Sequence, residues 1–303
     1  MYDIIIVGGG PAGLTAAIYG LRAGKTVLVI EKNSFGGQIA FSPKVENIPG
    51  IQVISGAEFA EKLTDQAMQL GADVELETVV EVKKQNGSFQ ILTEEGNSFT
   101  GSAVILALGV KHRTLGLPGE EDLIGNGISF CAVCDGAFYT GQDVVMVGGG
   151  NSALQEALLL SEVCNKVTIV QNLPHFTGEK KLADALAVKE NVEVHFSTLV
   201  TGYESENGQL IGVHLKNEET QNTWHLRADG VFLAVGLQPE NQPFASLANL
   251  NSWGYFDSAE DCRTQTEGLF VAGDCRSKQI RQIVTAASDG AIAAMAACRY
   301  LES

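Results

Sequence analysis

The sequence predicts an α/β protein with two Rossmann-like, doubly wound domains, the second inserted into the first. The main observation is an internal repeat: DIIIVGGG at 3–10 recurs nearly unchanged as DVVMVGGG at 143–150. Each copy is an apolar run that leads into glycines, a helical pattern and a second apolar run, which is the order of a βαβ unit. A chain of 303 residues is long enough for two ordinary domains.

The elements follow in chain order. Strand, helix and strand are expected at 3–7, 14–23 and 26–30, and again at 143–147, 154–163 and 166–170; further strands are expected at 103–108, 231–235 and 269–272, and a long alanine-rich helix at 281–301. Turn residues cluster at 111–119 and 236–239. They predict a discontinuous first domain, 1–112 plus 244–303, and an inserted second domain, 113–243. Two tandem domains are the alternative.

Composition and charge exclude several classes of protein. Apolar residues make up 45% of the chain and charged residues 18%, which is typical of a globular protein. No apolar run approaches the ~20 residues that span a bilayer, and no basic segment precedes the first apolar run. We therefore expect no membrane segment and a cytoplasmic location. A net charge of −16 argues against nucleic acid and anionic membranes as partners.

The first glycine turn predicts a dinucleotide site. Gly8-x-Gly10-x-x-Gly13 lies between an apolar strand and a helix, where glycines let a pyrophosphate approach the helix N-terminus. Glu31 ends the following strand, where a carboxylate can bind two ribose hydroxyls. An ordinary tight turn is the alternative. The spacing does not distinguish FAD from NAD.

Cys131 and Cys134 are the one closely spaced pair among the six cysteines. A C-x-x-C pair suits a reversible disulfide, because one thiol pKa can be lowered. Half of a zinc site is the alternative, but no second pair and no histidine spacing completes it, so no metal is expected. Cys164 and Cys298 lie in apolar helical stretches and are expected to be buried. Cys262 and Cys275 look incidental.

Nearly the whole chain resembles the low-molecular-weight thioredoxin reductases. The segments that carry the resemblance are Gly36–Gln38, Val45–Gly50, Cys131–Gly136 and Gly273–Gln282. It implies an FAD-containing homodimer that reduces thioredoxin and serves cell redox homeostasis. It also implies that Cys134 exchanges electrons with the flavin, that Cys131 attacks the substrate disulfide, and that Asp135 acts as general acid or base. A helix-start residue is the alternative for Asp135.

The expected FAD contacts come from the glycine turn and from the resemblance. Asp274 follows a strand and can accept a ribityl hydroxyl, while Arg281 and Gln282 are expected to begin the last helix with its positive end toward the flavin. A surface charge is the alternative for Arg281. The full set is Gly8, Gly10, Gly13, Glu31, Gly37, Gln38, Asn47, Gly109, Gly273, Asp274, Arg281 and Gln282.

The second glycine turn departs from the family pattern. Gly148-x-Gly150-x-x-Ala153 is present, but Gln171 replaces the acid, and segment 171–178 lacks the arginines that thioredoxin reductases offer to the 2′-phosphate of NADPH. This pattern resembles the ferredoxin-dependent flavin thioredoxin reductases, so we expect reduced ferredoxin as the electron donor. Ferredoxins are acidic, so docking would need a local basic surface. The candidate residues are Lys111, Arg113, Arg276 and Lys278, and ordinary solvated charge is the alternative for them.

Other functions remain open. The chain could use NADPH through atypical contacts at Asn172, His175 or Lys180, act as a dithiol oxidase of the same fold, or hold a second flavin. A non-enzymatic flavin-binding interaction module is the competitor from another class. Because Cys134 must meet the flavin and Cys131 a bulky protein disulfide, we also expect the domains to rotate about 111–119 and 236–239.

Overall fold

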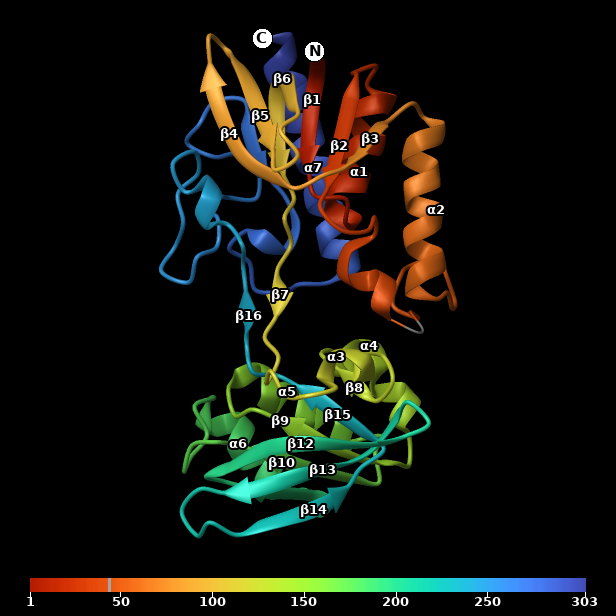
Figure 1. The fold of residues 1–303 in the computed structure, drawn as a ribbon, viewed down its shortest axis with the longest axis vertical. Helices are drawn as coiled ribbons and strands as arrows, with labels where there is room; N and C mark the ends of the chain where they lie inside the picture. The colour runs from red at the N-terminus through yellow and green to blue at the C-terminus, as the bar shows by residue number, and fades with distance from the viewer. Residues whose placement is uncertain (43–44) are drawn as a thin grey trace. The chain divides into compact units, whose positions relative to one another are not determined.

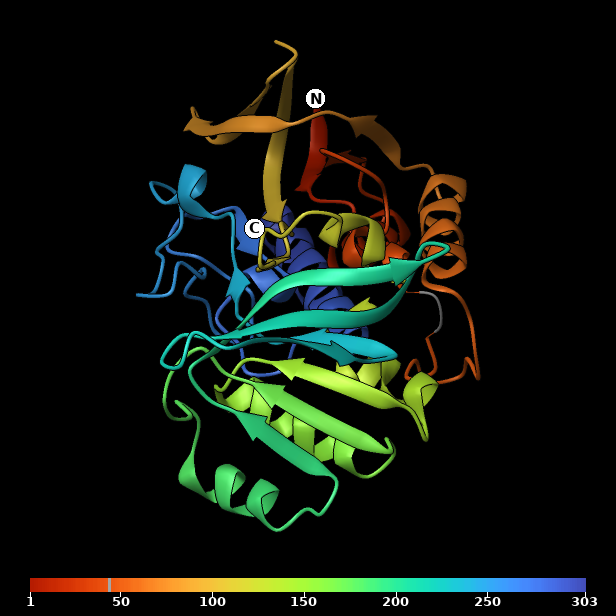
Figure 2. The ribbon, with the colours of Figure 1, turned by 60° about the horizontal axis from the view of Figure 1, so that its bottom comes forward.

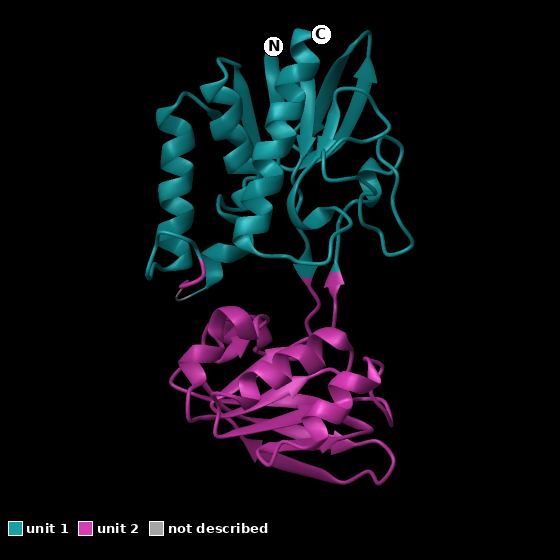
Figure 3. Cartoon of the chain, turned by 180° about the vertical axis from the view of Figure 1, so that it is seen from behind, with its two compact units in different colours: residues 1–43, 48–111, 238–303 teal, residues 44–47, 112–237 magenta. Residues whose placement is uncertain are grey.

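The computed structural model describes residues 1–42 and 45–303. The chain forms two compact units (Figure 3). The first unit comprises residues 1–43, 48–111 and 238–303, and the second comprises residues 44–47 and 112–237. The predicted fold class is confirmed, because each unit is built around a sheet of the Rossmann type and the second is inserted into the first.

The first unit contains a seven-stranded sheet in the order β3-β2-β1-β6-β5-β4, with β17 paired to β6 (Figure 1). Its parallel strands are β1 (Tyr2–Val7), β2 (Val27–Glu31), β3 (Asp73–Leu76), β6 (Ser98–Leu106) and β17 (Leu269–Val271); β4 (Val79–Gln85) and β5 (Ser88–Thr93) are antiparallel. Val7 pairs with both Ile30 and Leu106. The first glycine turn and Glu31 therefore lie at the same edge of the sheet.

Both faces of this sheet are covered, which explains why β1 is apolar throughout. On one face Ile4 and Ile6 pack against three helices, α1 (Pro11–Arg22), α2 (Gly56–Gln69) and α7 (Ile283–Glu302). On the other face Ile5 and Val7 pack against β4, β5 and the segment around Phe256. Short 3₁₀ turns complete the unit: η1 (Gly37–Phe41), η3 (Gln242–Phe244) and η4 (Gly273–Cys275).

The second unit repeats the arrangement with a five-stranded parallel sheet in the order β11-β10-β9-β15-β8 (Figure 2). These strands are β8 (Ile128–Ser129), β9 (Asp143–Val147), β10 (Lys166–Val170), β11 (Val192–His195) and β15 (Gly230–Leu233). Helices α5 (Asn151–Ser161) and α6 (Lys180–Ala187) cover one face, and an antiparallel sheet of β12 (Thr198–Glu206), β13 (Gln209–Asn217) and β14 (Thr223–Arg227) covers the other. Short helices α3 (Glu120–Leu123), α4 (Ala132–Asp135) and η2 (Gly136–Tyr139) complete it.

The two segments that join the units pair with each other. They are β7 (Lys111–His112) and β16 (Leu237–Gln238). The backbone N–H of Arg113 also donates to the carbonyl of Gly236 at 3.0 Å. These two segments therefore form a two-stranded ribbon.

The last helix begins later than predicted. Arg281 lies outside α7, and Gln282 is its N-cap, where the Gln282 N–H donates to the Thr285 hydroxyl at 3.1 Å in a capping box. Further along, Gly290 is needed because a Cβ there would lie 2.1 Å from the Ala12 carbonyl oxygen of α1. Within the described part of the chain, no helix combines the length and apolar character needed to cross a membrane.

Candidate active site

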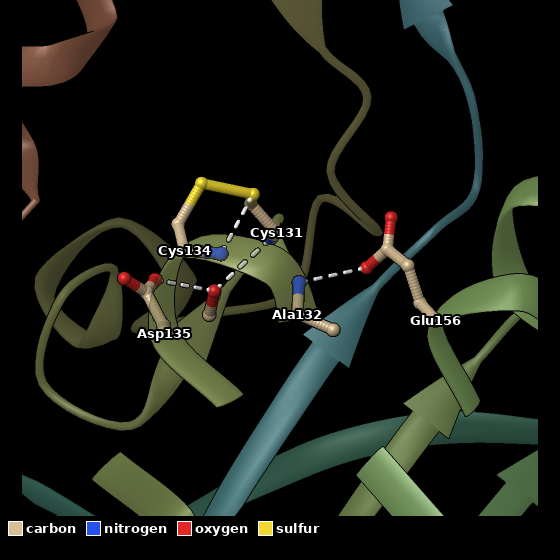
Figure 4. The surroundings of a disulfide bond; sticks show 6 residues. Cys131, Ala132, Cys134, Asp135 and Glu156 are labelled. Carbon is tan, nitrogen blue, oxygen red and sulfur yellow. Dashed lines mark hydrogen bonds between the residues drawn. A yellow bond between two sulfur atoms is a disulfide. The ribbon is translucent and has the colours of Figure 1, made fainter. Parts of the chain in front are cut away.

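The cysteine pair forms a disulfide at the start of α4, with its two Cα atoms 5.3 Å apart (Figure 4). Cys131 is the N-cap of the helix and has an extended backbone. The N–H of Cys134 donates to the Cys131 sulfur at 3.2 Å. Val133, between the cysteines, is 59% exposed, whereas both cysteines are partly buried. The arrangement provides a solvent-accessible turn that can cycle between disulfide and dithiol.

Two side chains from neighbouring elements hold this turn. The Ser129 hydroxyl, at the end of β8, donates to Asp135 Oδ2 at 2.6 Å and accepts from the Cys131 N–H at 3.1 Å. On the other side the Ala132 N–H donates to Glu156 Oε2 of α5 at 3.0 Å (Figure 4). The backbone that leads into the cysteine pair is therefore fixed from both β8 and α5.

Glu156 is a second carboxyl group at the turn and is not among the site residues predicted from the sequence. Burial raises its pKa to about 7, and the hydrogen bond from the Ala132 N–H opposes this shift only in part. No motif singles out Glu156, because its partner lies far away in the sequence. The one available signal is its place on the helix that follows the second glycine turn, where a carboxylate that faces inward needs a partner.

The first glycine turn is too tight for side chains. Gly8 has φ +110°, and a Cβ at Gly13 would lie 1.8 Å from the Gly8 carbonyl oxygen. Gly10 is the N-cap of α1, and the first turn of that helix contains no acidic residue. Glu31 Oε2 accepts from the Gly9 N–H at 2.7 Å, which brings the expected ribose-binding carboxylate to the turn. This geometry suits a pyrophosphate at the helix N-terminus.

A second segment carries the other expected cofactor residues. Asp274 lies in η4, and its Oδ1 is buried without a partner among the described residues. Burial raises the pKa of Asp274 to about 6, although Lys278 and Arg281 oppose the shift. A buried carboxyl oxygen without a partner is unusual and fits a hydroxyl donor from a ligand. Arg281 lies over the Tyr255 ring at 4.3 Å and donates from Nε to the Asp274 carbonyl at 3.3 Å.

The two segments adjoin each other. A Cβ at Gly273 would lie 2.8 Å from the Ala12 Cβ at the start of α1, and a Cβ at Gly37 would lie 3.3 Å from the Gly10 Cα. The structure therefore brings most of the expected FAD residues together in the first unit. The others are placed as follows: Gln38 donates to the Val110 carbonyl, Gly109 follows β6 with φ +65°, Gln282 caps α7, and Asn47 is exposed in the stretch 44–47 that is grouped with the second unit.

Three of the four residues considered for a basic surface are engaged by carboxylates, and Arg276 is not a solvated charge either, whereas Arg113 is exposed. Arg276 is 2% exposed, and its Nε donates to Asp289 Oδ2 at 2.8 Å; Lys278 Nζ donates to the same oxygen at 2.8 Å. Lys111 forms an ion pair with Glu240 at 2.8 Å. The physical reason is that buried Asp289 requires cationic partners, and both come from the loop that precedes its helix.

The second glycine turn bonds to its own loop. Gln171 is 4% exposed, and its amide donates to the His175 carbonyl at 3.1 Å. The N–H groups of Thr177 and Gly178 both donate to the Gly149 carbonyl at 2.9 Å. Lys180, the first cation beyond this loop, is bonded to Asp184 at 2.7 Å. The second turn therefore has the amide of Gln171 at the position where the first turn has the carboxyl group of Glu31.

The remaining cysteines are inert. Cys164, Cys262, Cys275 and Cys298 are buried thiols. Burial raises the pKa of Cys164 to about 11 and the pKa of Cys262 and Cys275 to about 12. Such thiols remain protonated and are poor nucleophiles. Among the described residues no group of three or more histidine, cysteine or acidic side chains gathers as a metal site would require.

Comparison with known proteins gives consistent results. The family model for the pyridine nucleotide-disulphide oxidoreductases matches residues 2–290. A 34.2 kDa protein in the rubredoxin operon of Clostridium pasteurianum is 40% identical over 299 residues, 99% of this chain and 97% of the relative. Thioredoxin reductase of Bacillus subtilis strain 168 is 38% identical over 302 residues, 100% of this chain and 95% of the relative.

A solved structure extends the likeness to three dimensions. The thioredoxin reductase of Streptococcus pyogenes MGAS5005 superimposes with a TM-score of 0.93 at 36% identity, covering 100% of this chain and 98% of the other. The family model and these relatives cover nearly the whole chain. The chain therefore belongs to the pyridine nucleotide-disulphide oxidoreductases, within them to the low-molecular-weight thioredoxin reductases, and is a flavoprotein disulfide oxidoreductase.

Proposed function

We propose that this protein is an FAD-dependent thioredoxin reductase that receives electrons from reduced ferredoxin and passes them to thioredoxin through Cys131 and Cys134. The observation that carries the proposal is the disulfide at an accessible helix start, with Asp135 beside it. Relatives named as thioredoxin reductases support thioredoxin as the substrate. We also propose a homodimer, which size-exclusion chromatography with light scattering would test.

FAD fits the first unit, which we assign as the FAD-binding domain, and the second unit is then the NADPH-binding-like domain. Gly8, Gly10 and Gly13 leave room for a pyrophosphate, Glu31 offers a carboxylate for the ribose, and the unpartnered Oδ1 of Asp274 suits a ribityl hydroxyl. Bound FAD supplies the ability to collect single electrons and deliver them as a pair.

The cysteine turn would perform the exchange with thioredoxin in two steps. The Cys131 thiolate attacks one sulfur of the thioredoxin disulfide, a mixed disulfide forms, and the other thioredoxin sulfur leaves as a thiolate that Asp135 protonates. The Cys134 thiolate then attacks the Cys131 sulfur. This closes the Cys131–Cys134 disulfide and releases thioredoxin as its dithiol. Each cycle consumes the two electrons that had opened the pair.

The second glycine turn supports ferredoxin over NADPH as the donor. Loop 171–178 contains no lysine or arginine, and Gln171 donates its amide hydrogen to its own loop. Each missing charge-assisted contact to the 2′-phosphate would weaken binding by ~1.5–3 kcal/mol. Because Lys111, Arg276 and Lys278 are paired with carboxylates, they do not supply a basic docking surface for ferredoxin, and the donor proposal depends on loop 171–178 alone.

An anaerobic, thioredoxin-coupled assay tests the donor. We expect turnover with reduced ferredoxin and none with NADPH at concentrations that saturate an ordinary reductase. Rapid bleaching of the flavin by NADPH would refute ferredoxin as the donor. The variant Cys134→Ser, with FAD still bound, should be inactive with either donor; activity in that variant would refute the disulfide pathway itself.

A further inference from the structure

Ser129 is a buried polar residue beside the cysteine turn to which neither the motif nor the exchange chemistry assigns a task. It ends β8 and is paired in register with Phe232 of β15. Only 5% of its surface is exposed. Its hydroxyl has one hydrogen, and because a carboxylate can only accept, that hydrogen is committed to Asp135 Oδ2 at 2.6 Å. The Ser129 Oγ also accepts a hydrogen bond from the Cys131 N–H at 3.1 Å.

We propose that Ser129 is a positioning residue, which orients the Asp135 carboxylate relative to Cys131 for proton transfer during disulfide exchange. The inference depends on the proposed role of Asp135 as general acid. One oxygen atom links the carboxylate to the backbone of the attacking cysteine. The strand that carries Ser129 therefore helps to set the distance between proton donor and cysteine, in addition to the helical bond from the Asp135 N–H to the Cys131 carbonyl at 3.0 Å.

The local backbone gives a reason for such a link. Asp135 is the last residue of α4, which spans only Ala132–Asp135, and the chain then changes to the 3₁₀ turn of η2. A side chain at such a junction is poorly fixed by its own helix. General acids work only within a narrow range of distance and angle, and supporting hydrogen bonds usually provide it.

The second unit also shows the ordinary use of a buried serine. Ser161, at the end of α5, donates to the carbonyl of Leu158 at 2.7 Å, three residues before it. That bond is local and is typical of serine in helices. Ser129 instead bridges a side chain of the helix and a backbone amide of the cap, which a purely local role does not require. Ser161 therefore provides the matched control.

The test uses single-turnover exchange, so that it does not depend on the electron donor. The holoprotein is reduced anaerobically with dithionite, desalted, and mixed with oxidised thioredoxin, and the rate constant of thioredoxin reduction is measured. Threonine and valine have the same shape and differ only in the hydroxyl. We expect Ser129→Thr to react at the wild-type rate and Ser129→Val to be about tenfold slower, with an unchanged half-saturating thioredoxin concentration. Ser161→Ala should match the wild type.

A double-mutant cycle separates positioning from a structural effect. Asp135→Asn should slow the reaction about 100-fold. Adding Ser129→Val to it should then slow the rate by much less than the roughly tenfold expected in the wild-type background, because only the bond from the Cys131 N–H is still lost. Independent, multiplicative effects, or equal rates for the threonine and valine variants, would overturn the assignment of Ser129 alone. Full activity of Asp135→Asn would instead refute the proposed acid and remove the basis of the inference with it.

Discussion

Two carboxyl groups at the cysteine turn, Asp135 and Glu156, have different surroundings. Asp135 accepts from the Ser129 hydroxyl, whereas Glu156 accepts from the Ala132 N–H alone among the interactions described for it. Burial raises the pKa of Glu156 to about 7, from an ordinary value of 4.5, and no nearby charge contributes appreciably to the shift. The protein therefore keeps this carboxyl protonated over part of the range in which an unfolded chain would ionise it.

This shift has a definite sign for stability. Between pH 4.5 and 7 the folded state binds more protons than the unfolded state, so the free energy of unfolding falls as pH rises and levels off above pH 7. The variant Glu156→Gln keeps an oxygen for the Ala132 N–H but cannot ionise. We expect its free energy of unfolding to exceed that of the wild type by on the order of 1–2 kcal/mol at pH 8 and by less at pH 5.5. Melting temperatures measured at the two pH values check this.

The control is Glu162→Gln, at the end of the same helix, where the carboxylate is exposed and pairs with Lys189. That change should alter stability by less than about 0.5 kcal/mol at either pH. A stability difference between Glu156→Gln and the wild type that stays constant from pH 5.5 to 8 would show that ionisation of Glu156 is not its cause.

At the scale of elements, the two glycine turns differ in the space that they leave. A Cβ at Gly13 would lie 1.8 Å from a carbonyl oxygen of its own turn, whereas the corresponding Ala153 is accommodated and fully buried. We therefore expect Gly13→Ala to lose FAD and to destabilise the first unit by ~3 kcal/mol or more, because the backbone must move. The reciprocal Ala153→Gly should cost about 1 kcal/mol and leave FAD bound. Flavin absorbance after gel filtration measures retention, and an unchanged flavin content in Gly13→Ala would contradict this account.

A buried charge cluster fastens α7 to the segment that carries Asp274. Asp289 Oδ2 accepts from the Gly273 N–H at 3.0 Å as well as from Arg276 and Lys278. Asp289→Asn would leave Lys278 without this counter-charge and Arg276 with the exposed Glu260 at 3.5 Å, and breaking a buried pair in this way typically costs ~3–5 kcal/mol. We expect a lower melting temperature and faster loss of FAD. The matched change Asp261→Asn, at an exposed carboxylate 3.8 Å from Arg263, should affect neither. Wild-type FAD retention in Asp289→Asn would show that the cluster does not support the cofactor segment.

Sequence pattern predicted those elements whose signal is local. The strands at 143–147 and 166–170 have the predicted bounds, since continuous apolar runs flanked by turns identify buried parallel strands. The antiparallel strands β4, β5 and β12–β14 were not anticipated, because the prediction depended on continuous apolar runs beside glycine turns, and these half-buried strands mix buried and exposed residues. The surroundings of Arg276 and Glu156 were not predicted for another reason. Their partners, Asp289 and the Ala132 N–H, are 13 and 24 residues away, and a charge that is buried by a carboxylate of another segment looks the same in sequence as one in solvent.

For the whole molecule, the division into two units has a thermodynamic consequence. Each unit has its own buried clusters. A ligand that binds one unit stabilises that unit by RT ln(1 + [L]/Kd), or about 4 kcal/mol when its concentration is 1,000 times Kd. If FAD binds the first unit alone, the two units should respond differently to its removal.

The two tryptophans allow this to be measured. Trp253 lies in the first unit and is 80% exposed, whereas Trp224 lies on β14 in the second unit, beside His195 at 5.4 Å between ring centroids. In a Trp253→Phe variant the remaining fluorescence reports on the second unit, while calorimetry reports on both. We expect removal of FAD to lower the melting temperature of one calorimetric transition, that of the first unit, by several degrees. The melting temperature measured by fluorescence, that of the second unit, should not change. Because the second unit contains the glycine turn that lacks a charge, added NADPH should not move the fluorescence transition either. If the fluorescence melting temperature rises with FAD concentration, the two units unfold together. If it rises with NADPH concentration, the second unit binds the nucleotide, and NADPH becomes a candidate donor again.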